Sequence, residues 1–190
     1  MAAGTEDPRE GPGGHAVLFY SAGDELAGQV SEFLLEAIRA GGVAVVIATQ
    51  AHRDAIAAAL AGAGIDVAAH QAAGLYMALD AFETTDRVMV ADWPSAASFW
   101  HVIRPIVARA AEAGTPVHVF GGMVALLWDL GQVNAAIEVE AMWNELAAQY
   151  SFSLLCSYPA DSVRGDQHQD ALAEVCRVHA SVAGDVPGRA

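Results

Sequence analysis

Seven histidines, two cysteines and many acidic residues are the side chains of this 190-residue chain that could do chemistry. A nucleophile and a base could be assembled on paper from Cys156, His118 and an acid, but GxSxG, HExxH and CxxC are all missing from the sequence. No two histidines have the tight spacing of a zinc ligand set, and His168 and His179 would lie about three helical turns apart. The sequence therefore predicts no catalytic residue, no bound metal and no cofactor.

Lysine is absent from the sequence, because all nine basic residues are arginine. A Walker A loop needs a lysine on the β/γ-phosphates, a pyridoxal enzyme needs a Schiff-base lysine, and an SxxK acyltransferase needs one beside its serine. The segment 21–28, SAGDELAG, also has acidic residues where a phosphate-binding loop would hold its ligand. We therefore expect that the protein is not an enzyme.

The charge and hydropathy of the chain restrict its partners and its location. The formal net charge of −14 repels phosphate backbones and anionic membranes. No apolar run approaches the roughly 18 to 20 residues that cross a bilayer, and residues 1–14 have neither the basic start nor the apolar centre of a secretion signal. We expect a cytoplasmic protein with reduced thiols that binds neither nucleic acid nor a membrane.

Short apolar runs alternate with longer, alanine-rich amphipathic stretches, which is typical of parallel strands joined by crossover helices. The pattern predicts strands at 16–20, 43–48, 116–120 and 152–157, and the brief runs 65–68 and 75–79 also fit strands. It predicts helices within 21–42, where Ser21 and Asp24 have capping-box spacing, and at 52–60, 95–113 with a kink at Pro105, 123–130, 133–149 and 167–181. We infer an α/β domain at 15–182 with a three-layer α/β/α architecture and a mostly parallel sheet, between a disordered leader at 1–14 and a disordered tail at 183–190.

Ligands of open parallel sheets bind beyond the carboxyl ends of the strands, where helix N-termini gather. The sequence has four such turns, at 20–23, 49–52, 120–123 and 157–159. The candidate ligand-binding residues are His15, Tyr20, Ser21, Thr49, Gly121, Gly122, Met123, Cys156 and Tyr158. For His15, the favoured alternative is a structural role at the start of the strand. For Cys156, the favoured alternative is a place in the core.

Two other features have both a structural and a functional interpretation. Three glutamates make the helix at 133–149 acidic: Glu138, Glu140 and Glu145. We interpret them as a solvated face with Trp143 packed inward, and a docking surface is the alternative. Trp93 beside Pro94 lies in a loop-like segment, where it is either part of the core or an exposed anchor for a partner.

Several motifs occur together in one order: HAVLFY at 15–20, FGGM at 120–123, IEVEAMWNELA at 137–147, LLCSYP at 154–159, and His179. In this combination the chain resembles the MEDS domain, the methanogen/methylotroph DcmR-type sensory domain. The resemblance implies a RecA/KaiC-like fold without its P-loop, and His15 matches the N-terminal histidine of the family. Relatives often have an acidic residue in a GEM-like triplet where this chain has Gly121, Gly122 and Met123, so any role of that carboxylate is absent here.

The resemblance also implies a function. It predicts a non-catalytic sensory domain in signal transduction that binds a small organic molecule, a signalling partner, or both. The partner would be a histidine kinase, an anti-sigma factor or a transcription regulator, and we expect a stand-alone input module whose output passes through that partner. The alternatives are an interaction module without a small ligand and a vestigial nucleotide-binding domain, and a homo-oligomer stays open.

Overall fold

A six-stranded sheet forms the centre of the protein. The computed structural model describes residues 14–112, 114–164 and 168–184. The strands lie in the order β3-β2-β6-β7-β1-β8, and each neighbouring pair is parallel. Their bounds are β1 His15–Tyr20, β2 Val43–Ala48, β3 Tyr76–Asp80, β6 Val117–Gly121, β7 Ser153–Pro159 and β8 Ser181–Gly184.

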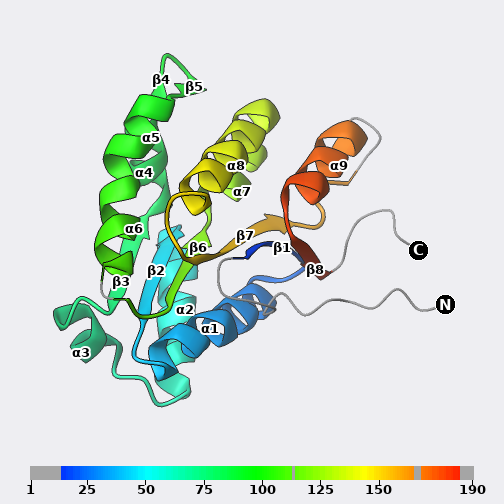
Figure 1. Cartoon of the computed structure of the whole chain (residues 1–190). Helices are drawn as coiled ribbons and strands as arrows, with labels where there is room; N and C mark the ends of the chain where they lie inside the picture. The colour runs from blue at the N-terminus through cyan, green and yellow to red at the C-terminus, as the bar shows by residue number, and fades with distance from the viewer. Residues whose placement is uncertain (1–13, 113, 165–167, 185–190) are drawn as a thin grey trace.

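Helices cover both faces of the sheet. They are α1 Gly23–Arg39, α2 Gln50–Gly62, α3 Val67–Ala72, α4 Ala81–Val88, α5 Ala96–Val102, α6 Arg104–Ala111, α7 Met123–Asp129, α8 Val133–Ala147 and α9 Gln169–Val178. The apolar residues of α1 and α2 pack on one face, and those of α4 to α9 pack on the other (Figure 1). This arrangement confirms the predicted three-layer α/β/α class. Within the described ranges, no helix is both long and apolar enough to span a membrane.

The first strand shows why the sequences of the strands are unbroken apolar runs. Side chains of a strand alternate between the two faces of the sheet, and here both faces are covered by helices. Val17 and Phe19 therefore pack in the core under α4 to α9, whereas Leu18 and Tyr20 pack in the core under α1 and α2. All six residues of β1 are buried.

The direction of the chain across the sheet reverses at β3. From β1 the chain runs through α1 to β2 and through α2 and α3 to β3 at one edge, and it then returns through α4 to α6 to β6 and onward to β7 and β8. Crossovers between parallel strands are right-handed, so a reversal of direction moves the helices to the opposite face. The chain therefore leaves the neighbouring strands β2 and β6 toward opposite faces of the sheet. This divergence opens a crevice at the carboxyl ends of the two strands.

The segment 65–94 differs most from the prediction. The run 65–68 is not a strand, because Asp66 accepts a hydrogen bond from the backbone N–H of Ala69 (2.9 Å) and so starts α3. The segment 81–94, for which nothing was predicted, contains α4 and the antiparallel hairpin of β4 (Met89–Val90) and β5 (Trp93–Pro94). Ala91 and Asp92 have positive φ angles (51° and 60°), as a tight two-residue hairpin turn requires.

Three other boundaries depart from the prediction. The helix expected at 95–113 is divided at Ile103 into α5 and α6, which confirms the break beside Pro105. The helix expected at 167–181 ends at Val178, and β8 follows, so the tail predicted from 183 begins inside a strand. The capping box at the start of α1 is wrong, since the cap residue is Ala22, with no side-chain cap bond among the described residues. Residues 1–13 of the predicted leader and 185–190 of the tail lie outside the described ranges.

Candidate functional site

A pocket of about 300 Å³ lies in the crevice at the carboxyl ends of the strands. Its apolar walls are Ala48, Phe82, Phe120, Ala125, Leu126 and Leu130, and its polar groups come from Tyr20, Thr49, His52, Asp129 and Ser157. A cavity with mostly apolar walls and a few convergent polar groups is the usual form of a small-molecule site, and this volume is at the lower end of the range for such sites.

The turn after β6 shapes the floor of this pocket. The backbone N–H of Gly122 donates a hydrogen bond to the carbonyl of Ile47 in β2 (2.7 Å). A Cβ at position 122 would lie only 2.6 Å from that carbonyl oxygen, so a residue larger than glycine cannot occupy this turn without a backbone shift. The close approach brings the start of α7 over the end of β2, and α7 supplies Leu126 and Asp129 to the pocket.

The polar side chains of the pocket are held in their neutral forms, apart from one carboxylate. Burial, with a smaller contribution from Asp129, raises the pKa of Tyr20 to about 12, so the phenol keeps its proton. Burial lowers the pKa of His52 against the opposing effect of Asp129, and the imidazole is therefore neutral at pH 7. The ring of Tyr20 meets His52 edge-on with 6.2 Å between centroids, and the Thr49 hydroxyl accepts a hydrogen bond from the His52 backbone N–H (3.4 Å).

Arg53, one helical turn after Thr49 in α2, is bound to groups outside the pocket lining or to the backbone. Arg53 donates hydrogen bonds to the backbone carbonyl of Ala48 (2.9 Å) and to the carboxylate of Asp80 (2.7 Å). Among the described residues that line the pocket, none is lysine or arginine. Asp129 is thus the one acidic residue among the described residues that line the pocket, and it gives the wall a negative potential.

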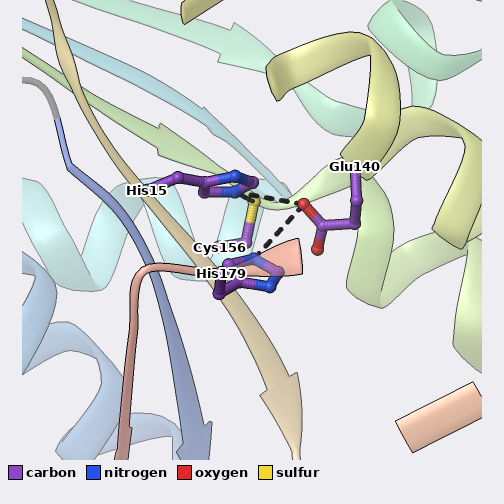
Figure 2. A group of neighbouring side chains, drawn as sticks. All are labelled: His15, Glu140, Cys156 and His179. Atoms are coloured by element: carbon purple, nitrogen blue, oxygen red, sulfur yellow. Dashed lines mark hydrogen bonds and ion pairs between the residues drawn. The ribbon is translucent and has the colours of Figure 1, made fainter. Parts of the chain in front are cut away.

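A second group of polar side chains lies on the face of the sheet that α8 and α9 cover. His15, Glu140, Cys156 and His179 point toward one another in Figure 2. His15 Nε2 is 3.2 Å from Glu140 Oε2 and 3.4 Å from Cys156 Sγ, and His179 Nε2 is 3.4 Å from the same Glu140 oxygen. All four side chains are buried, with exposed fractions of 0 to 7%. We call these four residues the histidine–glutamate cluster.

Four separate elements bring the cluster together. His15 begins β1, and the parallel register of β1 with β7 places Cys156 beside Val17 on the same face. His179 follows α9, and the backbone N–H of Ala180 donates to the carbonyl of His15 (2.7 Å). This contact brings the two imidazole rings together at a tilt of 52°, with 4.0 Å between centroids. Glu140 reaches the cluster from α8.

Each member of the cluster except the thiol has a further hydrogen-bond partner that fixes its orientation. His15 Nδ1 lies 2.9 Å from the Asn144 side-chain oxygen, and the Asn144 amide donates to the carbonyl of Val178 (3.1 Å). His179 Nδ1 lies 2.6 Å from the carbonyl of Val175. The Tyr158 hydroxyl donates to Glu140 Oε1 (2.8 Å). With Nδ1 protonated toward these oxygens, both Nε2 atoms point into the cluster.

Burial and the neighbouring charges shift the acid–base behaviour of the cluster. Burial alone would raise the pKa of Glu140, but His179 and His15 outweigh it and hold that pKa well below its ordinary value. Burial lowers the pKa of His179, and the adjacent Glu140 more than compensates, so the net shift is upward. Burial, followed by the charge of Glu140, raises the pKa values of the Cys156 thiol and the Tyr158 phenol. Glu140 is therefore ionised, and the thiol and the phenol keep their protons.

The structure divides the candidate residues from the sequence between these two places. Tyr20, Thr49 and Gly122 line the pocket, whereas His15, Cys156 and Tyr158 belong to the histidine–glutamate cluster or contact it. Of the other three, Gly121 lies beside Cys156 on the neighbouring strand β6 and borders the cluster, Ser21 is exposed after β1, and Met123 is buried in the core. The carboxyl-edge rule thus located the pocket, but His15 is at the amino end of its strand.

Sequence reasoning did not assign Glu140, His179 and Asn144 to a site, although all three lie in the motifs on which the family resemblance rests. The interpretation of Glu140 as part of a solvated face is wrong, because its side chain is completely buried. Its spacing carried a signal, since position 140 is one helical turn from Trp143 and Ala136, both of which are buried. No local pattern relates His179 to His15, because their contact depends on the pairing of β8 with β1.

The fold defines an α/β domain with a pocket at the carboxyl ends of its parallel strands, and a comparison with known families identifies its class. The model of the family described as MEDS, the MEthanogen/methylotroph, DcmR Sensory domain, matches residues 14–180. The chain therefore belongs to the MEDS family of sensory domains, and the predicted family is confirmed. No curated protein matches the chain.

Proposed function

We propose that this protein is a non-catalytic cytoplasmic sensory domain that binds a small, neutral or cationic organic molecule in the pocket at the carboxyl ends of β1, β2, β6 and β7. The observation that carries the proposal is the pocket itself, at the place where the chains after β2 and β6 leave to opposite faces. Its volume of about 300 Å³ limits the ligand to a compact molecule.

The side chains of the pocket support this ligand class. Tyr20 and Ser157 carry hydroxyl groups and His52 carries a neutral imidazole, so a ligand with one polar group could be oriented by hydrogen bonds. Phe82 and Phe120 supply aromatic surface, and Asp129 supplies a negative charge. Together these groups would hold an alcohol, an amide or an amine against the apolar walls.

A vestigial nucleotide site is the less favoured alternative. The RecA/KaiC-like ancestry that the family resemblance implies stays a prediction. A nucleotide would bring several negative charges toward Asp129, with no lysine in the sequence and with Arg53 bound to Asp80. The absence of a recognisable catalytic motif supports binding without turnover.

A thermal-shift screen of the purified chain tests the proposal. The probes are short-chain alcohols, amides, methylated amines, carboxylic acids and Mg-ATP, and a ligand at concentration [L] stabilises by RT ln(1 + [L]/Kd). We expect at least one neutral or cationic compound to raise Tm in a saturable manner. Ala125→Phe fills the pocket from α7 and should abolish the shift, whereas Ala141→Phe, at an exposed position on α8, should leave it unchanged.

Three outcomes would contradict the proposed ligand class or site. A shift confined to Mg-ATP or to carboxylates would overturn the argument from Asp129. A shift that survives Ala125→Phe would place the ligand elsewhere. Steady conversion of any stabilising compound to a product, at a rate proportional to protein concentration, would show that the protein is an enzyme.

We further propose that the output passes to a signalling protein, a histidine kinase, an anti-sigma factor or a transcription regulator. The β4–β5 hairpin supports a docking role, because Val90 and Trp93 expose 57% and 48% of their side chains there. Tryptophan is the residue most enriched at the energetic centres of protein interfaces. Trp93→Arg should weaken binding to the cognate regulator while leaving the pocket's thermal shift intact. A variant that binds the regulator as well as the unaltered chain does would exclude this hairpin as the docking surface.

A further inference from the structure

We propose that His15, Glu140, Cys156 and His179 form a tetrahedral binding site for a divalent transition-metal ion of the zinc class. The ligand atoms would be the Nε2 atoms of both histidines, Oε2 of Glu140 and Sγ of Cys156, and these groups all lie within 4.8 Å of one another. The site is separate from the pocket of the proposed function, because no residue belongs to both.

The distances fit a tetrahedron around zinc. Zinc bonds are about 2.0–2.1 Å to histidine nitrogen or carboxylate oxygen and about 2.3 Å to thiolate sulfur, so the edges of such a tetrahedron are about 3.3 to 3.6 Å. The contacts of Glu140 Oε2 with the two Nε2 atoms are 3.2 and 3.4 Å, and that of His15 Nε2 with Cys156 Sγ is 3.4 Å. The other three pairs of donor atoms lie within 4.8 Å, so the more distant donors would move inward around an ion.

The charges of the donor set select a divalent ion. A thiolate and a carboxylate together carry two negative charges, and two neutral imidazoles add none. An ion of charge +2 therefore gives an electrically neutral group, which a fully buried position strongly favours. Mixed nitrogen, sulfur and oxygen donors in tetrahedral arrangement suit zinc better than magnesium or calcium, which prefer oxygen alone.

The surrounding hydrogen bonds orient the ligands as metal sites usually require. The remaining ring nitrogens, His15 Nδ1 and His179 Nδ1, lie at hydrogen-bond distance from the oxygens of Asn144 and Val175. Such partners fix the tautomer that leaves Nε2 as the electron-pair donor. The hydroxyl of Tyr158 binds the other oxygen of Glu140, which leaves Oε2 for the ion.

Two buried polar atoms at the centre support a ligand there independently of the distances. Neither Glu140 Oε2 nor His179 Nε2 makes a hydrogen bond to any described residue, although they are 3.4 Å apart. A simple imidazolium–carboxylate pair would direct an N–H at that oxygen, and buried polar atoms are normally satisfied. A metal ion would satisfy both atoms at once, together with the thiol.

The test uses the full chain, stripped with dipicolinate and titrated with Zn²⁺ and with Co²⁺. We expect one equivalent of either ion to bind, with visible bands of tetrahedral Co²⁺ and a thiolate-to-cobalt charge-transfer band. Cys156→Ser should lose the charge-transfer band, whereas Cys176→Ser, a change at the other cysteine and outside the cluster, should keep both the band and the stoichiometry. Asn144→Ala should weaken Zn²⁺ binding about 10- to 100-fold, because Asn144 positions His15.

X-ray absorption of the zinc-loaded, unaltered chain makes the test independent of variant folding. One sulfur at about 2.3 Å and nitrogen or oxygen neighbours at about 2.0–2.2 Å are expected. Failure of the folded, stripped chain to bind one equivalent of either ion would overturn the proposal and identify the cluster as a buried ion pair. A charge-transfer band that persists in Cys156→Ser, or a zinc shell without sulfur, would also overturn it.

Discussion

Two tyrosines show how strongly the environment of a hydroxyl group decides its energetic importance. Tyr158 is completely buried, and its hydroxyl donates to the buried carboxylate of Glu140 (2.8 Å). Tyr150 is partly exposed, and its hydroxyl accepts a hydrogen bond from Arg104 (2.9 Å) at the surface. Water can replace a lost partner at the surface, but it cannot do so in the core, where an unpaired polar group keeps its full desolvation cost.

The matched variants Tyr158→Phe and Tyr150→Phe test this difference. Tyr158→Phe should lower the free energy of unfolding by about 1–3 kcal/mol, because it leaves Glu140 Oε1 buried without its donor. Tyr150→Phe should change it by less than about 0.5 kcal/mol, as is usual for surface substitutions. Urea unfolding monitored by circular dichroism, with a chelator present, gives both values. Equal effects of the two variants would contradict the assignment of the Tyr158 hydroxyl to Glu140.

At the scale of elements, two glycines in different surroundings have opposite expected effects. Gly122 is held against β2, where an added Cβ would lie 2.6 Å from the Ile47 carbonyl oxygen. Gly28 lies within α1, and nothing is within 4 Å of the position its Cβ would take. The first glycine is required by packing between elements, whereas the second only reduces the helix propensity of α1.

Gly122→Ala should therefore lower the free energy of unfolding by about 1–3 kcal/mol, as overpacked sites do. It should also distort the pocket and weaken the thermal shift of any ligand found in the screen. Gly28→Ala should raise the free energy of unfolding by about 0.5–1 kcal/mol and leave the ligand shift unchanged. Chemical denaturation of both variants provides the comparison. If Gly122→Ala left the free energy of unfolding unchanged, the turn after β6 would be able to move away from β2.

Much of this element order could be predicted from the sequence because buried parallel strands and amphipathic helices leave strong periodic signals. The strands at 16–20, 43–48 and 116–120 and the helices after them are confirmed nearly to their ends. The run 75–79 is confirmed as β3, but the short elements α3, β4, β5 and β8 were not predicted. β8 has four residues, Ser181–Gly184, too few for a periodicity, and it exists because the edge of β1 accepts it.

The histidine–glutamate cluster could not be predicted because its members are joined only by tertiary structure. His15 and His179 are at opposite ends of the domain and meet through the pairing of β1 with β8. Glutamate is usually found at the surface, because charged residues are almost never fully buried unless they are paired. The residue type of Glu140 therefore predicted exposure. The pocket was partly predictable, since Tyr20, Thr49 and Gly122 follow from the rule that ligands bind at carboxyl ends of parallel strands.

At the scale of the whole molecule, the pocket and the histidine–glutamate cluster share strands but no residue. In β7, Ser157 faces the pocket, while the residues on either side of it, Cys156 and Tyr158, face the histidine–glutamate cluster. In β1, His15 begins the strand at the cluster and Tyr20 ends it at the pocket. Because the two sites share no residue, each can be substituted separately. The filling of the pocket by Ala125→Phe and the removal of the thiol by Cys156→Ser are therefore independent experiments.

The net charge of −14 acts on the molecule as a whole. Repulsion among surface carboxylates opposes the compact state, and salt screens it, because the Debye length falls from about 30 Å at 0.01 M to about 8 Å at 0.15 M ionic strength. Raising NaCl over that range should therefore raise Tm. Glu32 and Glu36 illustrate the cause, since they are exposed like charges four residues apart on α1.

Glu32→Gln removes one member of this pair and should stabilise the protein by about 0.2–0.5 kcal/mol at low salt. The advantage should disappear at 0.15 M NaCl, because screening already relieves the repulsion in the unaltered chain. Scanning calorimetry of both proteins at the two salt concentrations, with a chelator present to exclude metal binding, measures the difference. A Tm that falls as NaCl is added would mean that specific ion pairs such as Arg53 with Asp80, rather than general repulsion, dominate the electrostatics of this domain.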